Sequence, residues 1–180
     1  MVKRITKFVA LMSITLLVVF TASIVEAADP AVNSVDSNGK WIVKVTGYAG
    51  EDHDSVIVGY VPNTTDGFNQ GYDATSLFKA GLHFALYMNR PDWAQNTPYA
   101  WIDVTSPTDM HDWVFHVYTA ELGTSVVLGW DASQVPAGLN VELIDNYTGV
   151  NVNMKEVEKY SFTSVENNRG FTVKVTSAGN

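Results

Sequence analysis

The chain of 180 residues contains no cysteine. Disulfides stabilise many small secreted domains, so a folded domain of this chain must depend on its hydrophobic core instead. The missing cysteine also excludes a thiol nucleophile and a lipid anchor attached to cysteine. The sequence has no Gly-x-Ser-x-Gly motif and no glycine-rich phosphate loop. It therefore lacks the common motifs of serine hydrolases and nucleotide-binding proteins.

Positive charge is scarce after residue 27. Residues 28–180 hold 8 basic and 18 acidic residues, which gives a net charge of −10. Such a chain repels phosphate backbones and anionic lipid surfaces, so we expect no nucleic-acid partner.

The first 27 residues predict a bacterial or archaeal export signal. Three basic residues lie within 1–7, an apolar run spans 8–25, and Val25 and Ala27 suit a cleavage site. The run is also close to the minimum for a membrane-spanning helix, so an uncleaved anchor is the alternative. We predict a signal peptide at 1–27 and a secreted or extracytoplasmic protein, in the periplasm or at the cell surface. We expect no membrane insertion after cleavage.

Short segments of alternating apolar residues predict an all-β fold. In the first segment Trp41, Val43 and Val45 share one face, whereas Lys44 and Thr46 share the other. Nine or ten such segments follow one another, separated by turn residues. Strands of this kind pair in antiparallel sheets that bury their apolar faces together. We predict an immunoglobulin-like antiparallel β-sandwich of about nine or ten strands, with a jelly roll as the alternative.

The chain divides into three parts. After the signal peptide we expect a flexible lead-in at 28–39 and a single β-sandwich domain at 40–177. The one helical candidate, of one or two turns, is 74–80. The inward rows of the sandwich are expected to include Trp41, Trp113, Trp130 and Phe171.

Two long irregular segments, 63–79 and 89–99, carry aromatic residues. Segments of this length in a compact sandwich are either functional or packed on themselves. If the rings line one surface, they could stack on sugar rings; otherwise they close the open ends of the sandwich. The candidate ligand-binding residues are Phe68, Tyr72, Trp93 and Tyr99.

Oxygen-bearing side chains cluster in the first of these segments. Asp66, Asn69 and Asp73 could bind calcium, which prefers several oxygen ligands on loops, although a solvated acidic turn is the alternative. Apart from this possible structural calcium we expect no cofactor. His111 and His116 have an odd spacing, which places them on opposite faces of a strand and disfavours a shared zinc ion.

Paired carboxylates are the remaining catalytic possibility. Glycoside hydrolysis needs two acids across a cleft, one of them with a raised pKa. Only Asp103 and Asp131 lie within or at the end of apolar strands, and Asp131 is better placed to accept backbone N–H bonds in a turn. We therefore expect no enzyme, and a small secreted hydrolase is the third possibility.

The C-terminal third contains an ordered series of short motifs. They are Leu-Gly-Trp-Asp at 128–131, Val-Pro-Ala-Gly at 135–138, Leu-Ile-Asp at 143–145, the Gly-x-x-x-x-Met of 149–154, Tyr-Ser-Phe at 160–162 and Arg-Gly-Phe-Thr-Val at 169–173. In this order they resemble a β-sandwich module of bacterial secreted and cell-surface proteins, and the resemblance covers roughly residues 40–176. Asp-Gly-Phe-Asn-Gln-Gly-Tyr-Asp at 66–73 is similar to a loop of the same modules. The resemblance implies an immunoglobulin-like fold, an extracytoplasmic location and an adhesive, scaffolding or ligand-presenting role, and it supplies no catalytic residues.

These observations predict an exported, non-enzymatic protein with an adhesion, surface-assembly or scaffolding role. Its partner is expected to be a protein or a glycan at the cell envelope. A carbohydrate-binding module that uses the loop aromatics is the alternative.

Overall fold

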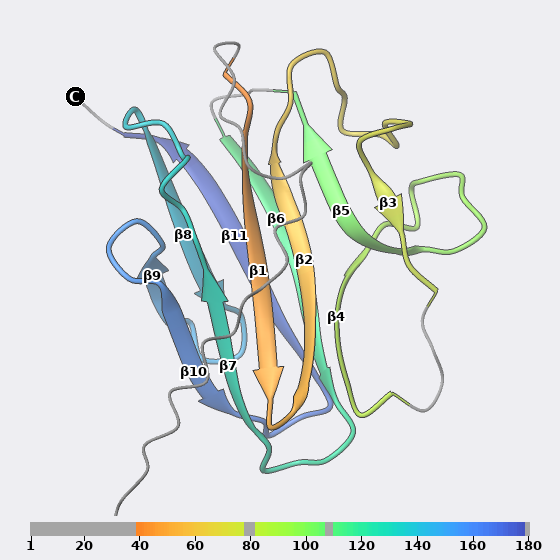
Figure 1. Ribbon diagram of the computed structural model, residues 1–180, viewed down its shortest axis with the longest axis vertical. Helices are drawn as coiled ribbons and strands as arrows, with labels where there is room; N and C mark the ends of the chain where they lie inside the picture. Colours follow the sequence, from red (N-terminus) through yellow and green to blue (C-terminus); the bar gives the residue numbers. More distant parts are fainter. Residues whose placement is uncertain (1–38, 78–81, 107–109, 179–180) are drawn as a thin grey trace, which may run out of the picture.

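The computed structural model describes residues 39–77, 82–106 and 110–178, and these residues form an all-β protein without helices (Figure 1). The prediction of an all-β fold is confirmed. The strands are β1 (Trp41–Ala49), β2 (Asp52–Tyr60), β3 (Ala74–Thr75), β4 (Phe84–Asn89), β5 (Tyr99–Thr105), β6 (Met110–Thr119), β7 (Ser125–Trp130), β8 (Leu139–Asp145), β9 (Asn151–Asn153), β10 (Lys159–Thr163) and β11 (Asn168–Ser177).

The strands form one sheet that folds over on itself. The order is β10-β7-β1-β2-β5-β4-β6-β11-β8-β9, and β3 pairs with β5. Figure 1 shows β1 and β2 in front of β6 and β11. Aromatic contacts join the two layers: Trp41 lies 6.3 Å from Trp113, and Phe162 lies 5.2 Å from Phe171, between ring centroids. The predicted two-layer arrangement is therefore present, and its immunoglobulin-like type stays a prediction.

One strand pair corrects the antiparallel prediction. β2 and β5 run parallel, with Ile57 opposite Ile102 and Tyr60 opposite Thr105. Parallel neighbours need a long crossover connection, which the segment from 61 to 98 provides. The sheet is therefore mixed.

The predicted helix at 74–80 is wrong where the structure describes it. Ala74 and Thr75 pair instead with β5, opposite Ile102 and Ala100. Residues 78–80 lie outside the described residues, as do the predicted signal peptide and the lead-in up to residue 38. Among the described residues there is no helix that is long and apolar enough to cross a membrane.

The predicted core residues are buried. Trp41, Trp113 and Phe171 are at most 2% exposed, and Trp130 is 7% exposed. The indole Nε1 of Trp130 donates hydrogen bonds to the carbonyl oxygens of Met154, at 3.0 Å, and Val157, at 2.9 Å. These bonds attach the segment between β9 and β10 to β7. They thereby hold the two edges of the sheet near each other.

A close approach of β1 to β2 requires glycine at position 59. A Cβ atom there would lie 2.3 Å from the carbonyl oxygen of Trp41 and 2.7 Å from the Cα of Ile42. Both are backbone atoms, so no change of rotamer can relieve the clash. By contrast, a Cβ at Gly129 in β7 would find its nearest atom, the carbonyl oxygen of Glu158, at 3.8 Å.

We expect Gly59→Ala to destabilise the protein by about 1–3 kcal/mol, because the paired backbones must move apart. Gly129→Ala, a matched substitution in another central strand, should leave the free energy of unfolding unchanged or slightly higher. Urea denaturation of both variants measures the difference. Equal midpoints would contradict the close approach.

Candidate functional site

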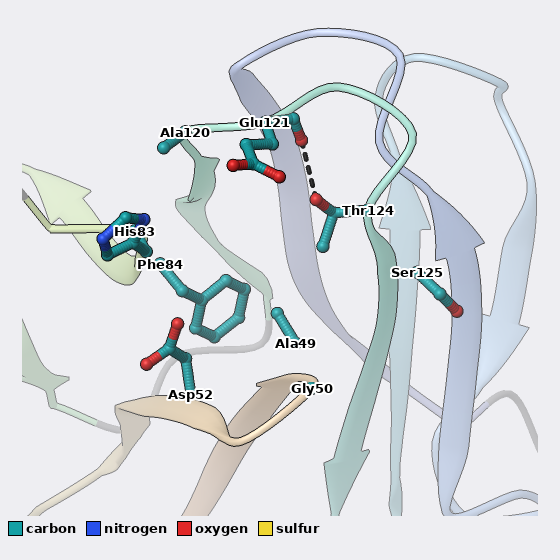
Figure 2. Close-up of a pocket in the computed structure, with 9 residues that line it drawn as sticks. All are labelled: Ala49, Gly50, Asp52, His83, Phe84, Ala120, Glu121, Thr124 and Ser125. Atoms are coloured by element: carbon teal, nitrogen blue, oxygen red, sulfur yellow. Dashed lines mark hydrogen bonds between the residues drawn. The ribbon is translucent and has the colours of Figure 1, made fainter.

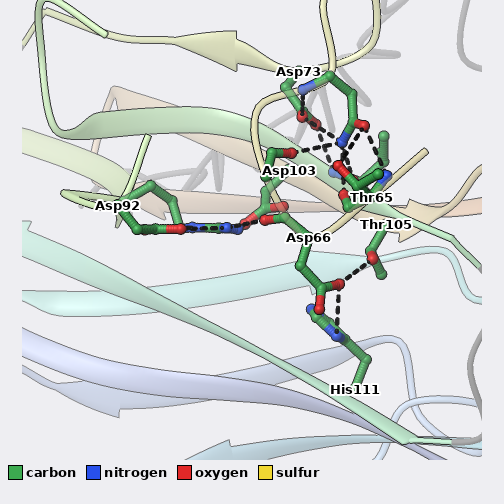
Figure 3. Close-up of polar contacts among 11 residues, drawn as sticks. Thr65, Asp66, Asp73, Asp92, Asp103, Thr105 and His111 are labelled. Carbon is green, nitrogen blue, oxygen red and sulfur yellow. Dashed lines mark hydrogen bonds and ion pairs between the residues drawn. The ribbon is translucent and has the colours of Figure 1, made fainter. Parts of the chain in front are cut away.

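The two long connections meet around the guanidinium of Arg90, which follows β4. Its Nη1 donates to Asp103, its Nη2 donates to the carbonyl oxygen of Asp66, and its Nε and Nη2 lie 3.0 and 2.8 Å from the carboxylate oxygens of Asp92. Figure 3 shows Asp92, Asp103 and Asp66 arranged around this point. We define the Arg90 cluster as Asp66, Arg90, Asp92, Asp103, Thr105 and His111.

A bulge in β5 places Asp103 inside the molecule. The pairing of β3 with β5 skips Trp101, so the alternation of inward and outward residues changes there. Beyond the bulge Asp103 and Thr105 lie opposite Val58 and Tyr60, whose side chains belong to the core. Asp103 is consequently only 3% exposed.

The charge of Asp103 is incompletely compensated. Burial raises its pKa to about 6, and the attraction of Arg90 only partly opposes this, while the nearby negative charges of Asp73 and Asp92 add to the rise. The pKa of Arg90 is raised, because the effects of Asp92 and Asp103 exceed the opposite effect of burial. Raised pKa values occur at functional sites and also in structural ion pairs, and the bond between Asp103 and Arg90 is of the second kind.

The opposite side of the Arg90 cluster joins Asp66 to His111. The Thr105 hydroxyl donates to Asp66 Oδ1, which lies 3.9 Å from His111 Nδ1. The imidazole packs edge-on against Trp113, with 4.3 Å between ring centroids. Burial lowers the pKa of His111, although Asp66 acts in the opposite direction. The imidazole is therefore mainly neutral at pH 7.

The predicted calcium ligands separate into two groups. Asp73 Oδ2 accepts hydrogen bonds from the backbone and side-chain amides of Asn69, at 2.6 and 2.9 Å, whereas the Asp66 carboxylate turns toward Thr105. Asp73 Oδ1 accepts from the backbone N–H of Val104, and Asn69 Nδ2 donates to the Val104 carbonyl. These two side chains thus take the place of a neighbouring strand at Val104, which lies beyond the residues of β5 that pair with β3 and β4.

Calcium binding here stays a prediction. The carboxylate of Asp73 already accepts three N–H groups, so a metal ion would have to displace them. In the part of the chain that the structure describes, no three His, Cys, Asp or Glu residues are grouped so that they could hold a metal ion.

Trp93 is 3% exposed, so it cannot belong to an exposed surface of loop aromatics. Phe68 is half-buried and packs edge-on against it, with 5.3 Å between centroids. The Arg90 guanidinium lies 4.6 Å from the centroid of the Trp93 ring. Phe68 and Trp93 therefore close the end of the sandwich, which is the alternative that the sequence left open.

The other two loop aromatics, Tyr72 and Tyr99, remain accessible. Tyr72 is 51% exposed. Tyr99, at the start of β5, is half-buried and packs edge-on against Tyr87 of β4, with 5.3 Å between centroids. Tyr99 thus belongs to the outer surface of the sheet. Sequence reasoning missed Tyr87, although its alternation with the inward residues of β4 was visible.

The two carboxylates considered for hydrolysis have different roles. Asp103 binds Arg90, whereas Asp131 is exposed and its Oδ1 accepts the backbone N–H of Ser133 at 2.8 Å. The prediction of a backbone-capping turn at Asp131 is confirmed. The prediction that His111 and His116 lie on opposite faces of their strand is confirmed, since His111 packs against Trp113 and His116 against Tyr87. Both side chains are half-buried.

A pocket of about 350 Å³ lies at the β1–β2 hairpin, where β4 begins and β6 ends. Figure 2 shows Asp52, His83 and Glu121 around the ring of Phe84. These three ionisable side chains are exposed. The pocket therefore lacks the water-excluding walls that would prepare a carboxyl group for acid catalysis.

A second buried aspartate contrasts with Asp103. Asp145 is 1% exposed and accepts hydrogen bonds from Arg169, from the Tyr160 hydroxyl at 2.7 Å and from the Thr148 hydroxyl at 2.8 Å. Burial alone would raise its pKa, but these donors, with the backbone N–H of Tyr147, lower the pKa to about 2. Asp145 is therefore a stabilising group rather than a reactive one.

We expect Asp145→Asn to destabilise the protein by about 3–5 kcal/mol at pH 7, because Arg169 would stay buried without its charged partner. The contribution of the wild-type carboxylate is complete above pH 3.8, its ordinary pKa, and is lost as the pH falls through about 2. Chemical denaturation measures both effects. Glu142→Gln, on the outer face of the same strand, should change little, and similar losses in both variants would refute the assignment.

Asp103 has the opposite pH dependence. Its pKa is raised from 3.8 to about 6, so folding is most favoured while the carboxyl is neutral, and stability falls as the pH rises through 6. A rise of this size corresponds to about 3 kcal/mol. Asp103→Asn should remove this fall in the free energy of unfolding between about pH 4 and pH 7. Asp131→Asn, an exposed control, should retain it; an unchanged pH slope in Asp103→Asn would show that the residue is not responsible.

Comparison of the chain with protein-family models, with curated proteins and with solved structures found no match. The geometry described above is therefore the basis for any assignment of function.

Proposed function

We propose that the chain is an exported, non-enzymatic β-sandwich protein that acts in adhesion, surface assembly or scaffolding at the cell envelope. The basic and apolar segments of residues 1–27 support export. The all-β architecture is compatible with an extracytoplasmic binding module, although fold alone does not determine function.

The observation that carries the proposal is that each buried aspartate is bonded to another segment of the protein. Among the described residues the buried aspartates are Asp73, Asp103 and Asp145. Asp73 accepts a hydrogen bond from Val104 of β5, Asp103 binds Arg90, and Asp145 binds Arg169. Each of these carboxylates connects segments that are distant in sequence. The interior polar groups thus contribute to the fold, which leaves the outer surface for recognition.

The net charge restricts the kind of partner. With −10 over residues 28–180, long-range electrostatics oppose approach to anionic surfaces. A partner at the envelope is therefore neutral or basic. Several large apolar side chains are exposed on separate strands, including Trp101 at 38% and Val114 at 47%. They supply contact area that does not depend on charge.

The test is retention by the envelope. The full chain, expressed with its leader and purified after export, should sediment with the envelope fraction of its source organism. Since the contacts are not mainly ionic, retention should persist at about 0.5 M salt. A protein that is strictly monomeric and is not retained at any salt concentration would exclude adhesion and surface assembly.

A further inference from the structure

The outer face of β4, β5, β6 and β11 carries a continuous group of aromatic and amide side chains. Tyr87 lies opposite His116 and their rings stack, with 5.3 Å between centroids; Tyr99 packs against the other side of Tyr87 at the same distance. The Tyr87 hydroxyl donates to Asn168 Oδ1 at 3.1 Å. We define the outer band as Tyr87, Asn89, Tyr99, His116, Tyr118 and Asn168.

The register of the strands makes these residues neighbours. Tyr118 lies opposite Asn168, and Asn89 lies opposite Tyr99. The four rings are half-buried, and the two asparagines are exposed. The outer band is therefore held in place by the sheet beneath it while its side chains remain accessible. Gly170, opposite His116, adds no side chain above this surface.

The outer band contains no aspartate, glutamate, lysine or arginine, in a chain whose residues 28–180 carry a net charge of −10. Burial lowers the pKa of His116 and raises the pKa of Tyr87, so both side chains are neutral. The next row along β6 and β11, where Val114 lies opposite Thr172, is also uncharged. Charged side chains return one row further, at Asp112 and Lys174. An uncharged surface matches a ligand without charge.

The chemistry of the outer band matches a sugar. Aromatic faces and edges pack against the C–H groups of a sugar ring, and amide, phenol and imidazole groups exchange hydrogen bonds with its hydroxyls. Every side chain of the outer band has a polar group beside its apolar or planar part.

From this combination we infer that the outer band binds a neutral oligosaccharide chain. The inference rests on the proposed function, because it names a glycan as the envelope partner. It differs from the loop-aromatic hypothesis, since of those four residues only Tyr99 belongs to the outer band.

The test is an NMR titration of the isotope-labelled full chain, purified after export, with neutral hexasaccharides of glucose, mannose, xylose and N-acetylglucosamine. A hexasaccharide of galacturonic acid serves as the charged probe. At least one neutral probe should shift the amide signals of the outer band, and the charged probe should not. The absence of shifts with every neutral probe at about 10 mM would overturn the inference, because affinity would then be weaker than any useful binding.

Matched variants locate the binding surface. Tyr87→Ala should weaken binding about tenfold, which corresponds to about 1.4 kcal/mol, and Asn168→Ala should weaken it without removing a core side chain. Tyr72→Ala, which removes an exposed loop ring outside the outer band, should bind as the wild type does. Binding that is lost in Tyr72→Ala and kept in the other two would overturn the inference in favour of the loops. Thermal denaturation shows whether Tyr87→Ala is folded. If it is not, the binding measured for Asn168→Ala tests the inference.

Two further outcomes separate this inference from the proposed function. If the envelope retains wild type and Asn168→Ala equally, the proposed adhesion is supported, but the outer band is not the adhesive surface. If the wild type dimerises with increasing concentration and Tyr87→Ala does not, the outer band binds a second copy of the chain and the glycan inference fails. Binding of a neutral hexasaccharide without envelope retention supports the outer band and contradicts adhesion.

Discussion

The structure depends on apolar contact between the two layers of the folded sheet. Trp41, Tyr60 and Trp113 form its aromatic centre, with 4.8 Å between the centroids of the first two rings and 5.6 Å between those of the last two. Aromatic side chains of this kind bury about 150–250 Å² each. Since no disulfide is present, this burial must offset the conformational entropy of a long chain with few local contacts. The distance between the two layers then determines how much space the connections 63–79 and 89–99 must fill.

The two buried aspartate–arginine pairs show how differently that space can be filled. Both pairs place a carboxylate beside a guanidinium, yet burial dominates at Asp103 and hydrogen bonding dominates at Asp145. Asp145 receives hydroxyl and backbone donors in addition to Arg169, whereas Asp103 has Arg90 and two repelling carboxylates nearby. A buried ion pair is stabilising only when further donors satisfy its remaining lone pairs. The two ion pairs consequently give the stability of the protein opposite dependences on pH.

Alternation along single strands was sufficient to predict the all-β fold and the inward rows of its core. The inward rows that contain Trp41, Trp113 and Phe171 follow directly from a period of two residues. The bulge at Trp101 could not be predicted in this way, and it reverses the side of the sheet on which Asp103 lies. The burial of Trp93 was left open for a related reason. Its burial depends on the Arg90 guanidinium and on Phe68, which lies 25 residues earlier in the chain.

The outer band was hidden from sequence reasoning because it is a property of the register. Tyr87 and His116 were visible as outward positions of two strands, but their contact depends on which residue of β4 lies opposite which residue of β6. A shift of one residue would turn each ring to the core face. The inward packing that fixes the register therefore also assembles the outer band. The surrounding acidity opposes the approach of anionic molecules and leaves the approach of an uncharged chain unaffected.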